Sequence, residues 1–77
     1  MEYDKDKVDE MVLALFYLTI HGQGTRAWKG MDWHVMNRLH EKDYIGDPIN
    51  QDRTVLMTPE GARLSKELFK KHFGLSP

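Results

Sequence analysis

Leu56-Met57-Thr58-Pro59-Glu60-Gly61 is the stretch that decides the fold, because it marks where a strand ends and a helix begins. Thr58 is a favourable N-cap, and a proline is well tolerated at the first helical position, which Pro59 would occupy. The β-branched and apolar residues within 53–57 predict a strand immediately before this cap. We expect the helix to continue to Gly74, where a glycine can end it. The stretch therefore predicts a strand that runs directly into a closing helix.

The segment between residues 44 and 57 predicts a short β-hairpin. Tyr44-Ile45 opens the hairpin, and Gly46-Asp47-Pro48 bends the chain. Asn50-Gln51-Asp52 then supplies turn residues that return the chain into the strand over 53–57. The hairpin is therefore expected to lead straight into the closing helix.

A second helix is predicted upstream of the hairpin, from Asp32 to about Lys42. Asp32 is a good N-cap, and Asp43 is expected to take the left-handed conformation that ends the helix. The glycine-rich segment 22–31 precedes this helix and predicts a single helical turn, which Trp28 would anchor to the core.

The first helix is predicted over about residues 6–21, and it is apolar on nearly all sides. Leu13, Tyr17 and Ile20 form one apolar face, which lies away from a broader one. At 100° per residue, the broader face gathers Val8, Met11, Val12, Leu15, Phe16 and Leu18. The run 11–20 could also form a buried strand, but its length and the Asp-Lys pattern before it favour a helix. A helix of this kind is either central in its domain or shared with a partner.

This order of elements resembles the second half of a winged-helix domain. In such domains a recognition helix is followed by a β-wing, and a Leu-Thr-x-x-Gly step leads into a closing helix. Residues 39–45 and 58–61 match that layout, whereas 22–31 is too short for the full second helix of a helix-turn-helix. The resemblance implies a mainly α fold with a short β-hairpin, in the order helix, turn, helix, β-wing, helix, within one domain over residues 1–77.

Nearly the full chain is also similar to a family of small uncharacterised bacterial proteins. The features that carry this similarity are Arg26-Ala27-Trp28-Lys29-Gly30, Asp32-Trp33, Arg38-Leu39-His40-Glu41-Lys42, Ile45 with Asp47-Pro48, and Leu56 with Thr58 to Gly61. The similarity supports the fold, and it implies no known activity and no functional residues.

Length and composition restrict the classes of protein. The 77 residues leave room for one domain with a modest core. The sequence has 0 Cys, which excludes disulfides and thiolate metal sites. We expect a cytoplasmic protein, because residues 1–10 do not resemble a secretory signal and the apolar run 11–20 is shorter than the roughly 20 residues of a membrane span.

The histidines and carboxylates form no pattern typical of a catalytic or metal site. His34 and His40 lie six positions apart on one predicted helix, whereas metal-binding pairs on a helix usually lie three or four apart. His72 falls on the apolar face of the last helix, where a half-buried structural role is expected. We therefore expect no enzyme activity, no metal, no cofactor and no small-molecule substrate.

Nucleic-acid binding is one functional hypothesis. Asn37 and Arg38 are residue types that read bases, and His34 lies on the same side of the predicted helix. Arg53 could contact a phosphate from the wing. The objection is charge, because residues 26–53 hold five basic and five acidic side chains, and phosphate contacts dominate affinity for DNA.

Self-association is the hypothesis that the sequence favours. The broader face of the first helix can pack into the chain's own core, which would leave Leu13, Tyr17 and Ile20 in water. A twofold pairing of two such helices would bury both copies of this second face at once. The sequence thus predicts a non-enzymatic protein-interaction module that forms a homodimer, with a DNA-binding regulator of winged-helix type as the alternative.

Overall fold

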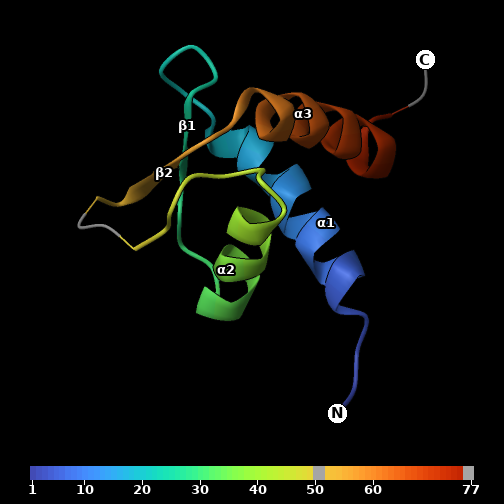
Figure 1. Ribbon diagram of the computed structural model, residues 1–77. Helices are drawn as coiled ribbons and strands as arrows, with labels where there is room; N and C mark the ends of the chain where they lie inside the picture. Colours follow the sequence, from blue (N-terminus) through green and yellow to red (C-terminus); the bar gives the residue numbers. More distant parts are fainter. Residues whose placement is uncertain (50–51, 76–77) are drawn as a thin grey trace.

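Three helices and a two-stranded sheet form the structure, a computed structural model that describes residues 1–49 and 52–75. In chain order the elements are helix α1 (Lys5–Phe16), the 3-10 helix η1 (Tyr17–Thr19), strand β1 (Arg26–Trp28), helix α2 (Trp33–Glu41), strand β2 (Thr54–Leu56) and helix α3 (Pro59–Phe73) (Figure 1). The predicted fold class is confirmed, since the chain is mainly helical with a small antiparallel sheet in a winged-helix-like layout.

Helix α3 begins where the sequence predicts, and its first turn is fastened to the chain that follows α2. The Thr58 hydroxyl accepts a hydrogen bond from the Gly61 backbone N–H at 2.9 Å and donates one to the Asp43 carbonyl at 2.7 Å. A Cβ at Gly61 would lie only 1.8 Å from the Tyr44 carbonyl oxygen. The N-cap and the glycine together let the helix start against the backbone of residues 43 and 44.

The two strands come from either side of α2 and run antiparallel. Their register pairs Arg26 with Leu56, Ala27 with Val55 and Trp28 with Thr54. Ala27 and Val55 are fully buried, so this central pair sets the inner face of the sheet. The strand predicted over 53–57 is confirmed at its centre, but its ladder partner is β1. The described residues of the hairpin predicted over 44–57 contribute one isolated bridge, between Ile45 and Met57. Residues 50 and 51 of the predicted turn lie outside the described residues.

The helical turn predicted for residues 22–31 is wrong, because this segment contains β1. Gly22, Gln23 and Gly24 all have positive φ angles, of 61°, 63° and 86°. They turn the chain tightly, so that His21 and Arg26 form an antiparallel bridge at the entry to the strand. The pairing with β2 outweighs the weak local preference for a helical turn.

Helix α2 has the predicted ends. The Asp32 carboxylate accepts the backbone N–H of His34 at 3.0 Å, and Asp43 follows the helix with a φ of 64°. Val35, Met36 and Leu39 are buried, as the predicted apolar side of this helix requires.

Helix α1 lies at the centre of the molecule and packs against both α2 and α3 (Figure 1). It ends at Phe16, and η1 continues the chain to Thr19, close to the predicted end of the first helix. The molecule is flat, with extents of 41 × 38 × 18 Å. Its core draws on every element except η1, through Val12, Leu13, Phe16, Ala27, Val35, Met36, Leu39, Val55 and Leu68.

Candidate functional site

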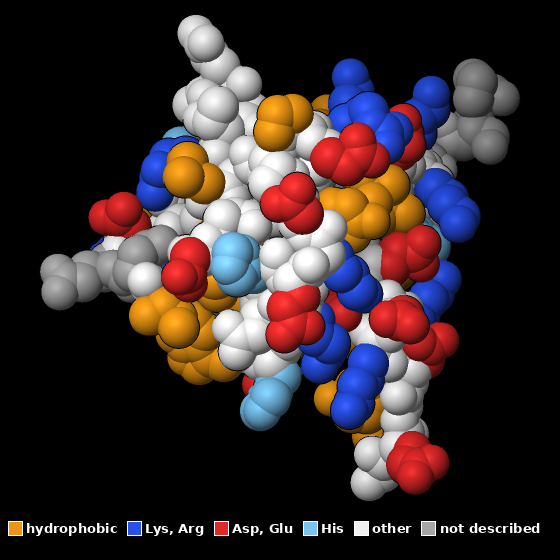
Figure 2. All heavy atoms as spheres, viewed as in Figure 1, with side chains coloured by type: hydrophobic (Ala, Val, Ile, Leu, Met, Phe, Trp, Pro, Cys, Tyr) orange, Lys and Arg blue, Asp and Glu red, His pale blue; other side chains and the backbone are white. Residues whose placement is uncertain are grey.

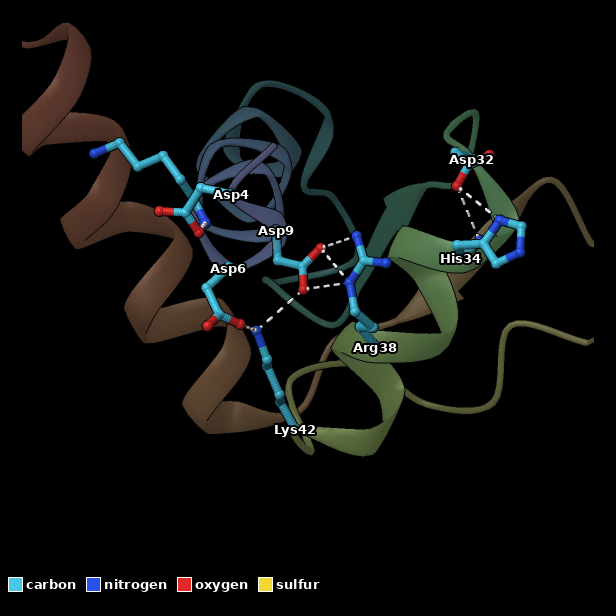
Figure 3. Close-up of polar contacts among 8 residues, drawn as sticks. Asp4, Asp6, Asp9, Asp32, His34, Arg38 and Lys42 are labelled. Atoms are coloured by element: carbon cyan, nitrogen blue, oxygen red, sulfur yellow. Dashed lines mark hydrogen bonds and ion pairs between the residues drawn. The ribbon is translucent and has the colours of Figure 1, made fainter. Parts of the chain in front are cut away.

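A buried ion cluster joins α1 to α2. Asp9 of α1 is only 1% exposed, and Figure 3 shows Arg38 and Lys42 of α2 directed at its carboxylate. Arg38 donates three hydrogen bonds to Asp9 at 2.8 to 3.0 Å, and Lys42 donates a fourth at 3.0 Å. Lys42 also contacts the exposed carboxylate of Asp6 at 3.1 Å. These bonds fix the second half of α2 against the first half of α1.

The partners of Asp9 keep the cluster ionised. Burial acts to raise the pKa of Asp9, but the hydrogen bonds and charges of Arg38 and Lys42 outweigh it and hold the pKa below its ordinary value of 3.8. The hydrogen bonds with Asp9 raise the pKa of Arg38. Burial acts to lower the pKa of Lys42, yet its bonds to Asp9 and Asp6 raise it overall. The cluster is therefore a satisfied structural network.

Arg38 is consequently removed from the predicted nucleic-acid contact. Its guanidinium is bonded to both oxygens of Asp9 and its side chain is largely buried. Releasing it to read a base would leave a buried carboxylate short of its main partner, which is strongly unfavourable. The sequence pattern could not reveal this, because Asp9 and Arg38 are brought together only by the packing of two helices.

The other three predicted nucleic-acid contacts lie on the surface. His34 and Asn37 are exposed on one side of α2, and the His34 ring lies 3.4 Å from the cap residue Asp32. Arg53 is exposed just before β2, where its carbonyl accepts the backbone N–H of Lys29 at 3.0 Å. His34 and Asn37 thus share an exposed side of α2, whereas Arg53 belongs to the chain just before β2.

The predicted self-association face is covered by α3 only in part, since Tyr17 remains 39% exposed. Leu13 is 1% exposed, and its carbonyl accepts a hydrogen bond from the buried Ser65 hydroxyl at 2.7 Å. The Tyr17 ring packs on Phe69 of α3, with 5.2 Å between ring centroids. Ile20 is half-buried against the core. Leu13 is thus a core residue rather than an interface residue, because α3 rather than a second chain packs on this side of α1.

The side of α1 that the chain leaves open carries apolar residues that the sequence had assigned to the core. Leu15 is 41% exposed and Leu18 is 66% exposed, while Val8 and Met11 are half-buried. We call these four residues the outer seam. Their spacing of three, four and three positions was visible in the sequence, but the helix is apolar nearly all round, and only the positions of α2 and α3 show which face stays uncovered.

A second exposed apolar patch lies at the end of β1 and the start of α2. Figure 2 shows hydrophobic side chains gathered there, at the lower left of the view. Trp28, Met31 and Trp33 are each about half exposed. Trp28 was predicted to anchor its segment to the core, but the alternation of β1 turns Ala27 inward and Trp28 outward.

A groove of about 440 Å³ lies between α1, the end of α2 and α3. Its charged lining is already paired within the chain, since Asp4 caps α1, Asp6 binds Lys42, and Glu10 lies 3.2 Å from Lys7. Its apolar lining is formed by Leu13, Leu39, Tyr44, Leu64 and Leu68. The groove therefore has an apolar surface but offers a ligand little charge that is not already neutralised.

His72 occupies the half-buried position predicted for it, between α3 and α1. Its Nε2 lies 3.4 Å from a carboxylate oxygen of Glu10. In the described part of the chain, no three His, Cys, Asp or Glu side chains are grouped so that they could hold a metal ion. Among the same residues, no helix has the length and apolar character needed to cross a membrane.

Comparison with known proteins places nearly the whole chain within one group. Residues 4–75 match the family described as "Domain of unknown function (DUF6429)". The chain is also similar to the uncharacterized protein y4hR of Sinorhizobium fredii (strain NBRC 101917 / NGR234), with 49% identity over 73 residues, which cover 95% of this chain and 97% of that protein. No solved structure matches. The predicted resemblance to a family of small uncharacterised bacterial proteins is thereby confirmed.

Proposed function

This chain belongs to the DUF6429 family, a domain of unknown function, and we propose that it acts as a non-enzymatic interaction module that pairs with a second copy of itself. Association of this kind needs neither a ligand nor a cofactor. It needs a surface that the chain's own fold leaves uncovered and that a partner can bury.

The exposed surface is larger than a compact monomer requires, and this observation carries the proposal. A compact monomer of 9.1 kDa is expected to expose about 4,900 Å², whereas this chain exposes 5565 Å². The difference is close to the roughly 800 Å² that each partner buries in an interface of standard size. The flat shape, only 18 Å in its shortest extent, and the exposed residues 1–4 contribute to the additional surface.

Much of this surface is apolar, which favours a protein partner. Leu15, Leu18, Trp28, Met31, Trp33 and Leu56 are all more than 40% exposed. Single exposed apolar side chains are ordinary, but several on neighbouring turns of one helix or one strand end indicate an interaction surface. A second copy presents the same surfaces and can bury them by twofold pairing.

The polar groups support a structural rather than a catalytic role. Asp9, the buried carboxylate, accepts four hydrogen bonds from Arg38 and Lys42. A catalytic acid or base usually has a pKa moved toward neutrality, whereas the pKa of Asp9 is moved away from it. The cluster of Asp9, Arg38 and Lys42 thus fits a role in holding α1 and α2 together.

DNA binding, the alternative function, receives less support from the same geometry. Arg38, the residue type best suited to a base contact on α2, is bonded to Asp9. His34 and Asn37 stay exposed, but Glu41 on the same helix is exposed as well. A docking helix with its arginine withdrawn has little positive charge to offer a phosphate backbone.

The test is the molar mass in solution, measured by light scattering or sedimentation equilibrium over a wide range of protein concentration. We expect a mass of twice 9.1 kDa at high concentration. A chain that stays monomeric at millimolar concentration would contradict the proposal. Addition of duplex DNA at low salt should leave the mass unchanged, whereas a salt-sensitive complex would favour the alternative.

A further inference from the structure

We infer, on the basis of the self-association proposed above, that two copies pair through the outer seam of α1, formed by Val8, Met11, Leu15 and Leu18. The occupant of this face is a second copy of the same chain, and its own outer seam makes the contact. Leu13, Tyr17 and Ile20 then serve the fold of each copy rather than the pairing.

The spacing of the outer seam is that of a helix pair. Its residues follow one another at intervals of three, four and three positions, which is the a and d pattern of a heptad repeat. Such a row keeps facing one side of a helix over several turns, so it can interlock with an identical row. From Val8 to Leu15 the row runs along α1 for about 10 Å, and Leu18 extends it by about 5 Å into the 3-10 helix η1.

The remaining sides of α1 are already occupied by the chain itself. Val12, Leu13 and Phe16 lie in the core, and Asp9 binds α2. Glu10 faces α3, where His72 and Lys71 lie 3.4 and 3.9 Å from its carboxylate. Within the outer seam, intramolecular packing therefore leaves Leu15 and Leu18 to solvent, whereas Met11 is half-buried and Val8 packs partly against the core.

From residue 11 onward, this side lacks the charges that a solvent-facing helix normally carries. Between residues 11 and 20 the sequence contains no charged side chain, and η1 continues α1 directly so that Leu18 extends the row. The exposed sides of helices in globular proteins are usually polar or charged. An uncharged apolar row of this length is better explained by burial against an equally uncharged surface.

Self-complementarity favours a second copy over an unrelated partner. The row fits its own image because both sides have the same spacing and neither presents a charge within 11–18. The chain's surface exceeds that of a compact monomer by about the area that one side of a standard dimer buries. The patch of Trp28, Met31 and Trp33 has no such periodicity and is interrupted by Lys29 and Asp32.

The experiment compares two double variants with the wild-type chain by sedimentation equilibrium. Leu15→Glu with Leu18→Glu places four like charges in the proposed contact of a dimer, so we expect the dissociation constant to rise roughly a hundredfold or more. Met31→Glu with Trp33→Glu introduces the same charges on the other apolar patch and should leave the dimer intact. Circular dichroism establishes whether each variant is folded.

The outcomes separate this inference from the proposed function. A monomeric wild type overturns both. A dimeric wild type whose outer-seam variant remains an equally tight dimer overturns the outer seam alone, and so does loss of the dimer in the Met31→Glu, Trp33→Glu variant. If the outer-seam double variant fails to fold, Leu18→Lys, at the most exposed position of the seam, replaces it. A folded Leu18→Lys protein that dimerises as tightly as the wild type overturns the inference.

Discussion

Asp9 and Arg38 stand 29 positions apart in the chain, and nothing in their local sequence marks them as partners. Asp9 is one of several acids in the first turns of a predicted helix, where solvated carboxylates are common. Arg38 lies on the polar side of another helix, which made a nucleic-acid contact a reasonable interpretation. Only the packing of α1 on α2 turns both side chains toward each other. Residue roles that depend on such tertiary pairs could not be predicted from spacing.

Replacement of Asp9 should therefore reduce stability although the residue is polar. Asp9→Asn keeps the shape but removes the charge that Arg38 and Lys42 bind, so we expect the free energy of unfolding to fall by about 2 kcal/mol. Urea denaturation measures the change. The matched control is Asp6→Asn, an exposed carboxylate on the same helix that also contacts Lys42, and its effect should stay within about 0.5 kcal/mol. Equal losses in the two variants would contradict the structural role of Asp9.

The same carboxylate should make stability depend on pH in the acid range. The pKa of Asp9 is lower in the folded chain than its ordinary value of 3.8, so the unfolded chain binds the proton more readily. The stabilisation is therefore fully present above the ordinary value and is lost as the pH falls through the folded pKa. We expect the difference in unfolding free energy between wild type and Asp9→Asn to shrink as the pH falls below the ordinary value of 3.8. A difference that stays constant over this range would exclude Asp9 as its source.

Helix ends follow from local chemistry, which is why Asp32, Asp43 and Thr58 could be placed from the sequence. Strand β1 could not be predicted, since residues 26–28 are too few to show a strand pattern. They form a hydrogen-bonded ladder only with residues 54–56, which follow α2 in the chain. The sequence also could not predict which sides of α1 the rest of the chain covers. A helix that is apolar on nearly all sides does not reveal which side α3 will pack against. The core and interface faces predicted from the sequence therefore differ from those in the structure.

The start of α3 offers a test at the scale of an element. Thr58 both caps the helix, by accepting the N–H of Gly61, and ties it to the chain that follows α2, by donating to the Asp43 carbonyl. Thr58→Ala removes both bonds, and we expect a loss of about 1 to 2 kcal/mol in the free energy of unfolding. Thr58→Ser retains the hydroxyl and is the matched control, with a change of less than half that size. A Thr58→Ala protein with an unaltered denaturation midpoint would show that the cap contributes nothing.

At the scale of the whole molecule, charge is distributed unevenly along the chain. This distribution affects whether the α1 helices of two paired copies run parallel or antiparallel. Residues 1–10 carry a net charge of −3, while the rest of the chain carries +2. Parallel pairing of two α1 helices would place the two acidic stretches side by side, where like charges repel. Antiparallel pairing separates them to opposite ends of the contact, and it also opposes the two helix dipoles. The antiparallel arrangement is therefore the expected one.

Disulfide trapping distinguishes the two orientations without interference, because the chain has 0 Cys. In an antiparallel pair centred on the outer seam, Leu18 of one copy lies beside Val8 of the other, while the two Leu18 positions are separated by about 15 Å. A disulfide requires Cα atoms within about 7 Å. We expect a mixture of the Val8→Cys and Leu18→Cys proteins to form cross-linked dimers on mild oxidation, and Leu18→Cys alone to form few. Non-reducing electrophoresis reads the result, and Leu15→Glu added to both proteins serves as the control that should suppress cross-linking. Efficient cross-linking of Leu18→Cys alone would instead demonstrate a parallel pair, because that arrangement places the two Leu18 positions in contact.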